Sequence, residues 1–69
     1  MNEAKAIELV RSHIADIGEQ GFTYPITGVR EHADVWAIAV QPTRPDGQPL
    51  YDYMGFDVDK VTGEVRHTV

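Results

Sequence analysis

The sequence predicts an α+β domain in which one N-terminal helix lies on one face of a four-stranded antiparallel sheet. Three observations predict this fold: an amphipathic helical pattern over about residues 2–18, four later segments with the alternation of strands, and short connections between them. Short connections join neighbouring strands as antiparallel hairpins, and a helix with one apolar face needs a sheet to lie against. A chain of 69 residues is one domain, 1–69.

The helix has start and stop signals. Asn2 is placed to act as the N-cap, and Glu3 lies where the helix dipole favours an acid. Gly18 is expected to end the helix in a left-handed C-cap conformation. Between these ends the apolar residues recur every three or four positions and form one stripe, which comprises Ala6, Ile7, Leu9, Val10, Ile14 and Ile17.

Four strands are expected, at about residues 22–30, 34–41, 50–59 and 64–69. Pro25 has no backbone N–H to donate, so the first strand is expected at a sheet edge or at a bulge. The proline-rich loop before the third strand has Pro-Asp-Gly as its turn. Alternate residues of the second and third strands are expected to face the helix, and this set is Trp36, Ile38, Val40, Met54, Phe56 and Val58.

The opposite face of the sheet is expected to be free of any helix. An uncovered face usually carries polar residues, but this one is largely apolar or aromatic. Its predicted members are Val35, Ala37, Ala39, Tyr51, Tyr53, Asp57 and Asp59. Tyrosine is enriched in interfaces because it offers a large area at low entropic cost. The face is therefore interpreted as a contact surface, with a mildly apolar surface that binds nothing as the alternative.

The predicted partner-binding residues are Tyr51, Tyr53, Val35 and Ala37 as apolar contacts, with Asp57 and Asp59 as a polar rim. The loop from Pro42 to Pro49 is a second candidate surface. Arg44 and Asp46 are its charged groups, and its prolines lower the entropy lost when the loop is ordered.

The segment FDVDKVTGEV, residues 56–65, is interpreted as a strand, a turn and the start of another strand. Asp59 is expected to accept hydrogen bonds from backbone amides ahead of it, and Gly63 to supply the positive φ of a bulged hairpin. A calcium loop is not expected, because Val61 stands where an oxygen ligand is required. Catalysis by Asp57 and Asp59 is not expected either, since both lie on an open, solvated face.

Composition argues against several other functions. The net charge of −5, with scattered basic residues, is unsuited to binding nucleic acid. The chain has no cysteine, and His13, His32 and His67 lack the spacing of a zinc site, so they are interpreted as independent surface residues. We therefore predict no enzymatic activity, no metal and no cofactor. A ligand site would require the three histidines to converge in the fold.

The N-terminal segment carries acidic residues and lacks a long uncharged apolar run. Neither a signal peptide nor a membrane-spanning segment is therefore expected. Together with the absence of cysteine, this predicts a soluble, cytoplasmic protein that does not bind a membrane.

The closing hairpin carries a family resemblance. Its pattern consists of Phe56, Val58, Asp59, Thr62, Gly63, Glu64 and Val65. This pattern resembles the closing hairpin of the PepSY family of small bacterial domains. The order of Trp36, Gly55, Val58, Asp59 and Lys60 also resembles that of YrhB-type immunity proteins of toxin systems. These resemblances imply a cystatin-like half-fold and a non-catalytic role, either inhibition of a peptidase or neutralisation of a toxin.

The function predicted from all of these features is a non-catalytic protein-binding module that inhibits or regulates a partner protein. The alternative is a structural homodimer in which two sheets meet face to face. A measurement of molecular mass by light scattering distinguishes the two, because a monomer excludes the homodimer.

Overall fold

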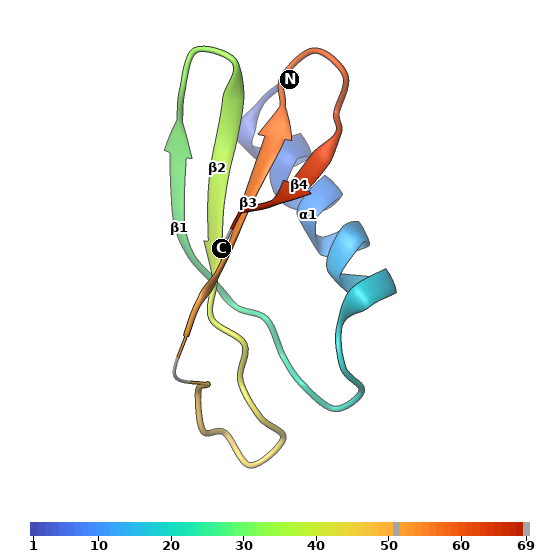
Figure 1. The fold of residues 1–69 in the computed structure, drawn as a ribbon, viewed down its shortest axis with the longest axis vertical. Coiled ribbons are helices and arrows are strands. Elements are labelled where there is room, and N and C mark those ends of the chain that lie inside the picture. Colours follow the sequence, from blue (N-terminus) through green and yellow to red (C-terminus); the bar gives the residue numbers. More distant parts are fainter. Residues whose placement is uncertain (51, 69) are drawn as a thin grey trace.

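A computed structural model describes residues 1–50 and 52–68 of the chain. The predicted fold class is confirmed, since one helix, α1 (Glu3–Ile17), lies across one face of a four-stranded antiparallel sheet (Figure 1). The strands are adjacent in the order of the sequence and comprise β1 (Ile26–Glu31), β2 (Val35–Val40), β3 (Met54–Asp59) and β4 (Val65–His67). The molecule measures 37 × 19 × 18 Å, because the loops that lead into β1 and β3 extend past one end of the sheet (Figure 1).

The two ends of α1 are stabilised in different ways. Asn2 is the N-cap, as predicted, and its Oδ1 accepts a backbone N–H of the first turn at 2.9 Å. The left-handed C-cap predicted for Gly18 is wrong, since its φ is −72°. Glycine is needed there for space, because a Cβ atom would lie 2.8 Å from the carbonyl oxygen of Ile14 and 2.9 Å from the ring of Tyr24. The Tyr24 hydroxyl accepts the N–H of Glu19 at 2.8 Å, which holds the ring over the helix end.

The core lies between α1 and the sheet face predicted to meet it. Its buried residues are Ala6, Val10, Ile14, Trp36, Ile38, Val40, Phe56 and Val58. Met54, the remaining member of the predicted set, is partly buried and packs against them. The ammonium group of Lys60 lies 5.5 Å from the centre of the Trp36 ring, a cation–π contact at the margin of this core. Helix α1 contacts β2, β3 and β4, so β1 lies at the margin of the core.

The strand predicted over residues 22–30 begins only at Ile26. The preceding residues cross to the loop after β2, where Thr23 and Thr43 exchange backbone hydrogen bonds of 2.9 and 2.8 Å. Pro25 explains the late start, because it has no N–H to donate to a continuous ladder.

The strand predicted over residues 50–59 also begins late, at Met54. Residues 50–53 would need the segment after β2 as their neighbour in the sheet. That segment does not continue the strand, because β2 ends at Val40 and Pro42 has no N–H to donate to a ladder. The Leu50 N–H instead donates to the Pro42 carbonyl at 2.8 Å, within the loop. The predicted Pro-Asp-Gly turn is confirmed by the hydrogen bond from the Gly47 N–H to the Arg44 carbonyl at 2.9 Å.

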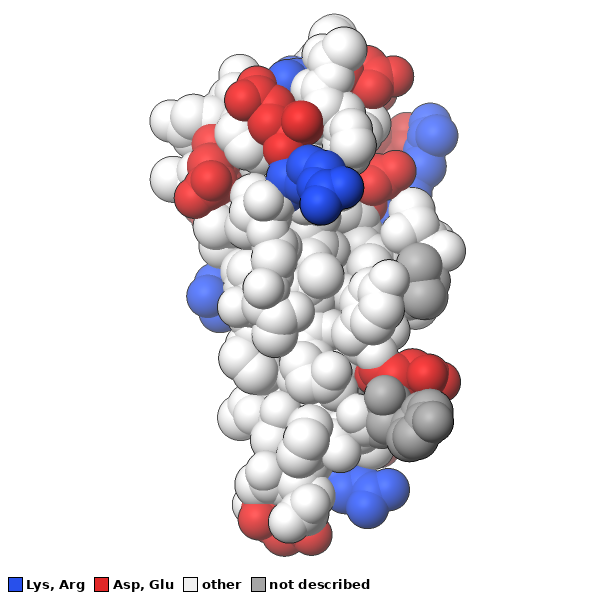
Figure 2. All heavy atoms as spheres, turned by 90° about the vertical axis from the view of Figure 1, so that its left-hand side faces the viewer, with Lys and Arg blue, Asp and Glu red and all other residues white. Residues whose placement is uncertain are grey.

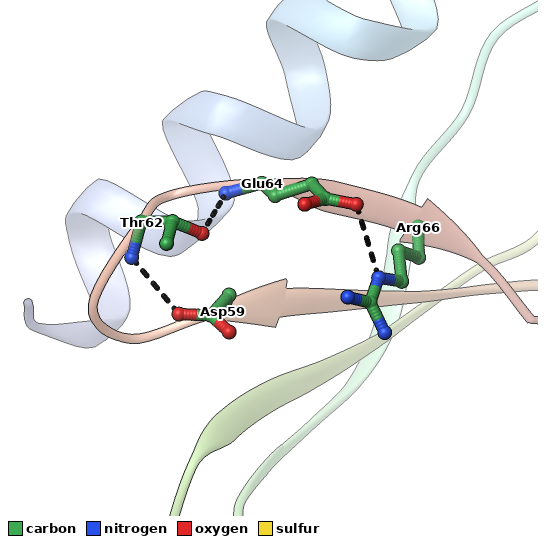
Figure 3. Close-up of polar contacts among 4 residues, drawn as sticks. All are labelled: Asp59, Thr62, Glu64 and Arg66. Carbon is green, nitrogen blue, oxygen red and sulfur yellow. Dashed lines mark hydrogen bonds and ion pairs between the residues drawn. The ribbon is translucent and has the colours of Figure 1, made fainter.

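The interpretation of FDVDKVTGEV as a strand, turn and strand is confirmed (Figure 3). Asp59 Oδ1 accepts the backbone N–H groups of Val61 at 2.8 Å and Thr62 at 2.9 Å. Gly63 has a φ of 76°, in the region that favours glycine. The last strand, predicted over residues 64–69, is observed as the shorter β4, and Val69 lies outside the described residues.

Candidate functional site

The sheet face opposite α1 is covered by no element of the described chain, and we call it the open face. The strand register aligns its residues in rows that cross the sheet. One row consists of Arg30, Ala37, Asp57 and Arg66. The next row consists of Gly28, Ala39 and Gly55, and the Thr68 N–H donates to the Gly55 carbonyl at 2.8 Å. The open face therefore has a charged row beside a row of very small residues.

The row of small residues forms the floor of a shallow, open hollow of about 630 Å³. Its three strand residues carry at most a methyl group, so the floor lies close to the backbone of the sheet. The hollow is lined by Thr27, Gly28, Val29, Arg30, His32, Ala37, Ile38, Ala39, Gln41, Tyr53, Gly55, Phe56, Asp57 and Thr68. Its size and position suit a side chain or a short segment of a partner protein better than an enclosed small ligand.

The hollow brings together three of the residues predicted to bind a partner. Ala37, Tyr53 and Asp57 all line it. Tyr53 is 51% exposed, which leaves much of its ring available for contact. Ala37 and Asp57 are directly opposite each other on β2 and β3.

The other predicted binding residues do not line this hollow. Val35 and Asp59 are opposite each other at the end of the open face where the β3–β4 turn begins. Arg44 is exposed in the loop at the far end of the molecule. Tyr51 lies outside the described residues.

The carboxylate of Asp59 is engaged by the turn rather than free to contact a partner. The backbone N–H groups of Thr62 and Val61 donate to its Oδ1 and lower the pKa of the Asp59 carboxyl below its ordinary value. Asp59 therefore contributes mainly to the closing hairpin. Of the two aspartates predicted as the polar rim of the contact surface, Asp57 is therefore the one available to a partner.

Sequence reasoning missed the two arginines of the open face. Arg30 and Arg66 lie at opposite ends of the row that contains Asp57. Arg66 Nε donates to Glu64 Oε1 at 3.1 Å (Figure 3), and this hydrogen bond raises the pKa of the Arg66 guanidinium. The signal was available, because a short turn fixes the register of a hairpin and the register places Arg30 opposite Ala37. The face is less apolar than predicted.

All three histidines are exposed or partly exposed, but the prediction that they are independent is wrong for two of them, since both contact the Phe56 ring. His13 meets the Phe56 ring edge-on at 5.7 Å, and His67 stacks on the same ring at 5.0 Å between centroids. The reason is register, because His67 is paired with Phe56 across β4 and β3. His32 is exposed and lines the hollow. Within residues 1–50 and 52–68, no group of three or more His, Asp or Glu residues is suited to hold a metal ion.

A second hollow, of about 490 Å³, lies between the end of α1, the segment before β1 and the loop before β3. It is lined mostly by apolar residues, among them Ile17, Phe22, Tyr24, Pro42, Leu50 and Met54. Tyr53 lines both hollows. Of the 42–49 loop, the second candidate surface, only Pro42 lines this second hollow, so Arg44 and Asp46 lie outside both hollows.

Comparison of the chain with protein-family models, with curated proteins and with solved structures finds no match. The resemblances to the PepSY and YrhB-type proteins therefore stay predictions. Helix α1, with 15 residues, is neither long nor apolar enough to cross a membrane, and the described part of the chain has no other helix.

Proposed function

We propose that the protein is a small, non-catalytic module that binds another protein and thereby inhibits or regulates it. The observation that supports this proposal most is the hollow on the open face, with a floor of Gly28, Ala39 and Gly55 and the exposed Tyr53 at its rim. A floor without large side chains admits a side chain from a partner, and an exposed tyrosine supplies an anchor at low entropic cost.

The charged row beside the hollow supports specificity. Arg30, Asp57 and Arg66 alternate in sign across the sheet, next to the small-residue floor. Such groups at the rim of an interface contribute to register and to rejection of wrong partners more than to affinity. A partner that fits this face presents an apolar or aromatic side chain to the hollow. Around it, acidic groups lie opposite Arg30 and Arg66 and a basic group lies opposite Asp57.

Inhibition of a peptidase or neutralisation of a toxin is the form of this function that the resemblance to PepSY and YrhB-type proteins implies. Both forms need only a binding surface and no catalytic residue. A cytoplasmic location is part of the same proposal.

The experiment is a pull-down with the tagged chain from a lysate of the source organism, with bound proteins identified by mass spectrometry. Tyr53→Ala removes the anchor, and Ala39→Arg fills the hollow. The matched control is Val61→Ala, because Val61 is an apolar residue that is 92% exposed in the β3–β4 turn, outside both hollows. We expect one dominant partner that the control retains and that both open-face variants lose.

A partner retained by both open-face variants would contradict the proposed site. Loss of that partner only in Arg44→Ala would assign the contact to the 42–49 loop instead. Light scattering on the purified chain tests the alternative function, since a dimer that Ala39→Arg converts to a monomer would favour the sheet-to-sheet homodimer.

A further inference from the structure

The two edges of the sheet differ in length and in charge. β4 forms one edge with three residues, and Glu64 and Arg66 make an ion pair of 3.1 Å there. β1 forms the other edge with six residues, and its first four, Ile26–Val29, carry no charge. Short strands and charged side chains are devices by which proteins prevent other chains from pairing with an edge. β4 carries both devices, whereas β1 lacks both over Ile26–Val29. The protection that β1 has, Pro25 and the bulge between Ile26 and Gly28, lies at its first residues and leaves the pairing regular from Gly28 to Glu31.

The outer side of β1 presents backbone hydrogen-bonding groups that β2 does not use. The His32 N–H donates to the Val35 carbonyl at 2.9 Å, which sets the alternation of the β1–β2 ladder. By this alternation Val29 and Glu31 direct their N–H and C=O groups away from β2. No element of the described chain lies beyond β1 (Figure 1). These groups are a template for an additional strand.

The surface around this edge is also suited to an additional strand. Figure 2 looks onto the edge and shows neither basic nor acidic residues along its central column. Most of the charged residues in this view lie towards the two ends, and a basic group and an acidic group lie at the two flanks. The hollow of the open face begins at β1, because Thr27, Gly28 and Arg30 line it. A strand paired with β1 would direct every second side chain to the side of the sheet where the hollow lies.

From this geometry we propose that the partner protein adds an extended segment to β1, as a fifth strand of the sheet. That a partner protein exists rests on the proposed function, and strand addition is the way in which that partner binds. The segment is uncharged beside Ile26–Val29 and carries an acidic side chain near Arg30, which makes no ion pair with any other residue among 1–50 and 52–68. Main-chain hydrogen bonds supply affinity, and the side chain over the hollow supplies specificity.

A second copy of this chain fits the β1 edge less well than a straight segment of another protein. The β1–β2 register shifts between Ile26 and Gly28, which marks a bulge, and Pro25 precedes the strand. In an antiparallel pair of two β1 strands centred on Val29, the bulge of each copy would lie opposite Glu31 of the other and end regular pairing on both sides. Each copy also carries a net charge of −5, which opposes association.

The test is a selection of random phage-displayed peptides on the immobilised full chain, followed by binding and NMR measurements with a synthetic peptide of the selected sequence. We expect peptides with an uncharged run and one acidic residue. Their binding should slow hydrogen exchange at the amides of Val29 and Glu31, whereas the His32 amide is already paired.

A matched pair of variants isolates the backbone contact. Glu31→Pro removes an outward N–H together with the side chain, and Glu31→Ala removes the side chain but keeps the N–H. Glu31→Pro loses the outward hydrogen bond and is expected to bind the peptide about tenfold more weakly than the wild type. Glu31→Ala keeps this hydrogen bond and is expected to bind the peptide as the wild type does. Should Glu31→Pro fail to fold, N-methylation of the peptide amides that face β1 tests the same hydrogen bonds.

Several results would overturn strand addition. Peptides that bind without protecting Val29 and Glu31, and that lose binding in Ala39→Arg, would restrict the contact to the open face and leave the proposed function intact. Protection of the same two amides that rises with the concentration of the chain alone would make a second copy the occupant. A selection that yields no peptide would also contradict binding of an extended segment. If, in addition, no partner is captured from the lysate, the proposed function is contradicted as well.

Discussion

The two faces of the sheet are built from the same strands but contribute differently to the protein. On the covered face Ile38, Phe56 and Val58 are at most 2% exposed and pack against α1. On the open face the residues between them in sequence are small or charged and line a hollow. Since successive residues of a strand point to opposite faces, a substitution can alter one face without altering the other. Stability should therefore depend mainly on the covered face and binding on the open face.

The largest expected effect is on the covered face. Phe56 is 1% exposed, and its ring meets those of His13 and His67. Phe56→Ala should lower the free energy of unfolding by about 3–5 kcal/mol. The single core of a chain this short rarely supplies more than about 3–5 kcal/mol in total, so the variant should be largely unfolded by circular dichroism at room temperature. Ile38→Val, at about 0.5–1.5 kcal/mol, gives a folded variant on which urea denaturation can quantify the same face. A stable Phe56→Ala variant would contradict the assignment of the core.

The next largest effect compares two glycines. Gly63 has a φ of 76°, so Gly63→Ala should destabilise the chain by about 1–2 kcal/mol in urea denaturation. Gly28 on the open face is the control, because a Cβ atom there would meet only the Cβ of Ala39, at 3.8 Å. Gly28→Ala should change stability by less than about 0.5 kcal/mol. Equal losses in the two variants would show that the open face is packed more tightly than described.

A smaller effect is expected on the pH dependence of stability, and it should differ between the two aspartates of β3, Asp57 and Asp59. The backbone N–H groups of Thr62 and Val61 lower the pKa of Asp59 in the folded state, so the unfolded state binds more protons as the pH falls. The stabilisation is present above the unfolded pKa of about 3.9 and is lost as the pH falls through the lower folded value. Thermal melts between about pH 2 and pH 5 should show a shallower acid loss in Asp59→Asn than in the wild type.

Asp57→Asn is the matched control for this comparison, because it makes the same chemical change on the same strand away from the turn. Its stability at neutral pH should stay close to that of the wild type. If Asp59→Asn and Asp57→Asn were equally unstable at neutral pH, the hydrogen bonds of the turn would not explain the importance of Asp59.

The smallest effect on stability is expected at Tyr53, at the rim of the open face. Because its side chain is 51% exposed, Tyr53→Ala should change the free energy of unfolding by no more than about 0.5 kcal/mol and should keep the helical signal in circular dichroism. The same variant is expected to lose the partner in the pull-down. A loss of stability as large as that of a core variant would mean that the binding defect reports unfolding rather than a contact.

Local patterns predicted the elements whose physics is local. The stripe of α1, the Asn2 cap and the Asp59–Gly63 turn each depend on residues within a few positions of one another. The cap and the turn are confirmed. The stripe is confirmed except at its last member, Ile17, which is 49% exposed. The left-handed cap predicted for Gly18 is wrong, because glycine serves there to leave space for the Ile14 carbonyl oxygen and the Tyr24 ring rather than to adopt a positive φ. The late start of β3 also has a non-local cause, since a strand needs a neighbour that continues beside it, whereas the late start of β1 is explained by Pro25 within the segment itself.

The candidate site was predictable only in part. Alternation alone placed Ala37, Tyr53 and Asp57 on one face, and the structure brings them to one hollow. Arg30 and Arg66 were missed because they belong to the outer strands, and the register across the sheet places Arg66 opposite Asp57 and Arg30 opposite Ala37.

The sequence by itself determined the fold class and which residues of β2 and β3 face the helix, because helical periodicity and strand alternation are properties of single segments. Pro25 also predicted a strand at an edge or a bulge, and β1 has both. The tertiary structure decided which side chains share a row, and that Gly28, Ala39 and Gly55 make one floor. These features depend on the register between segments that are far apart in the chain, and each segment taken alone is compatible with several registers.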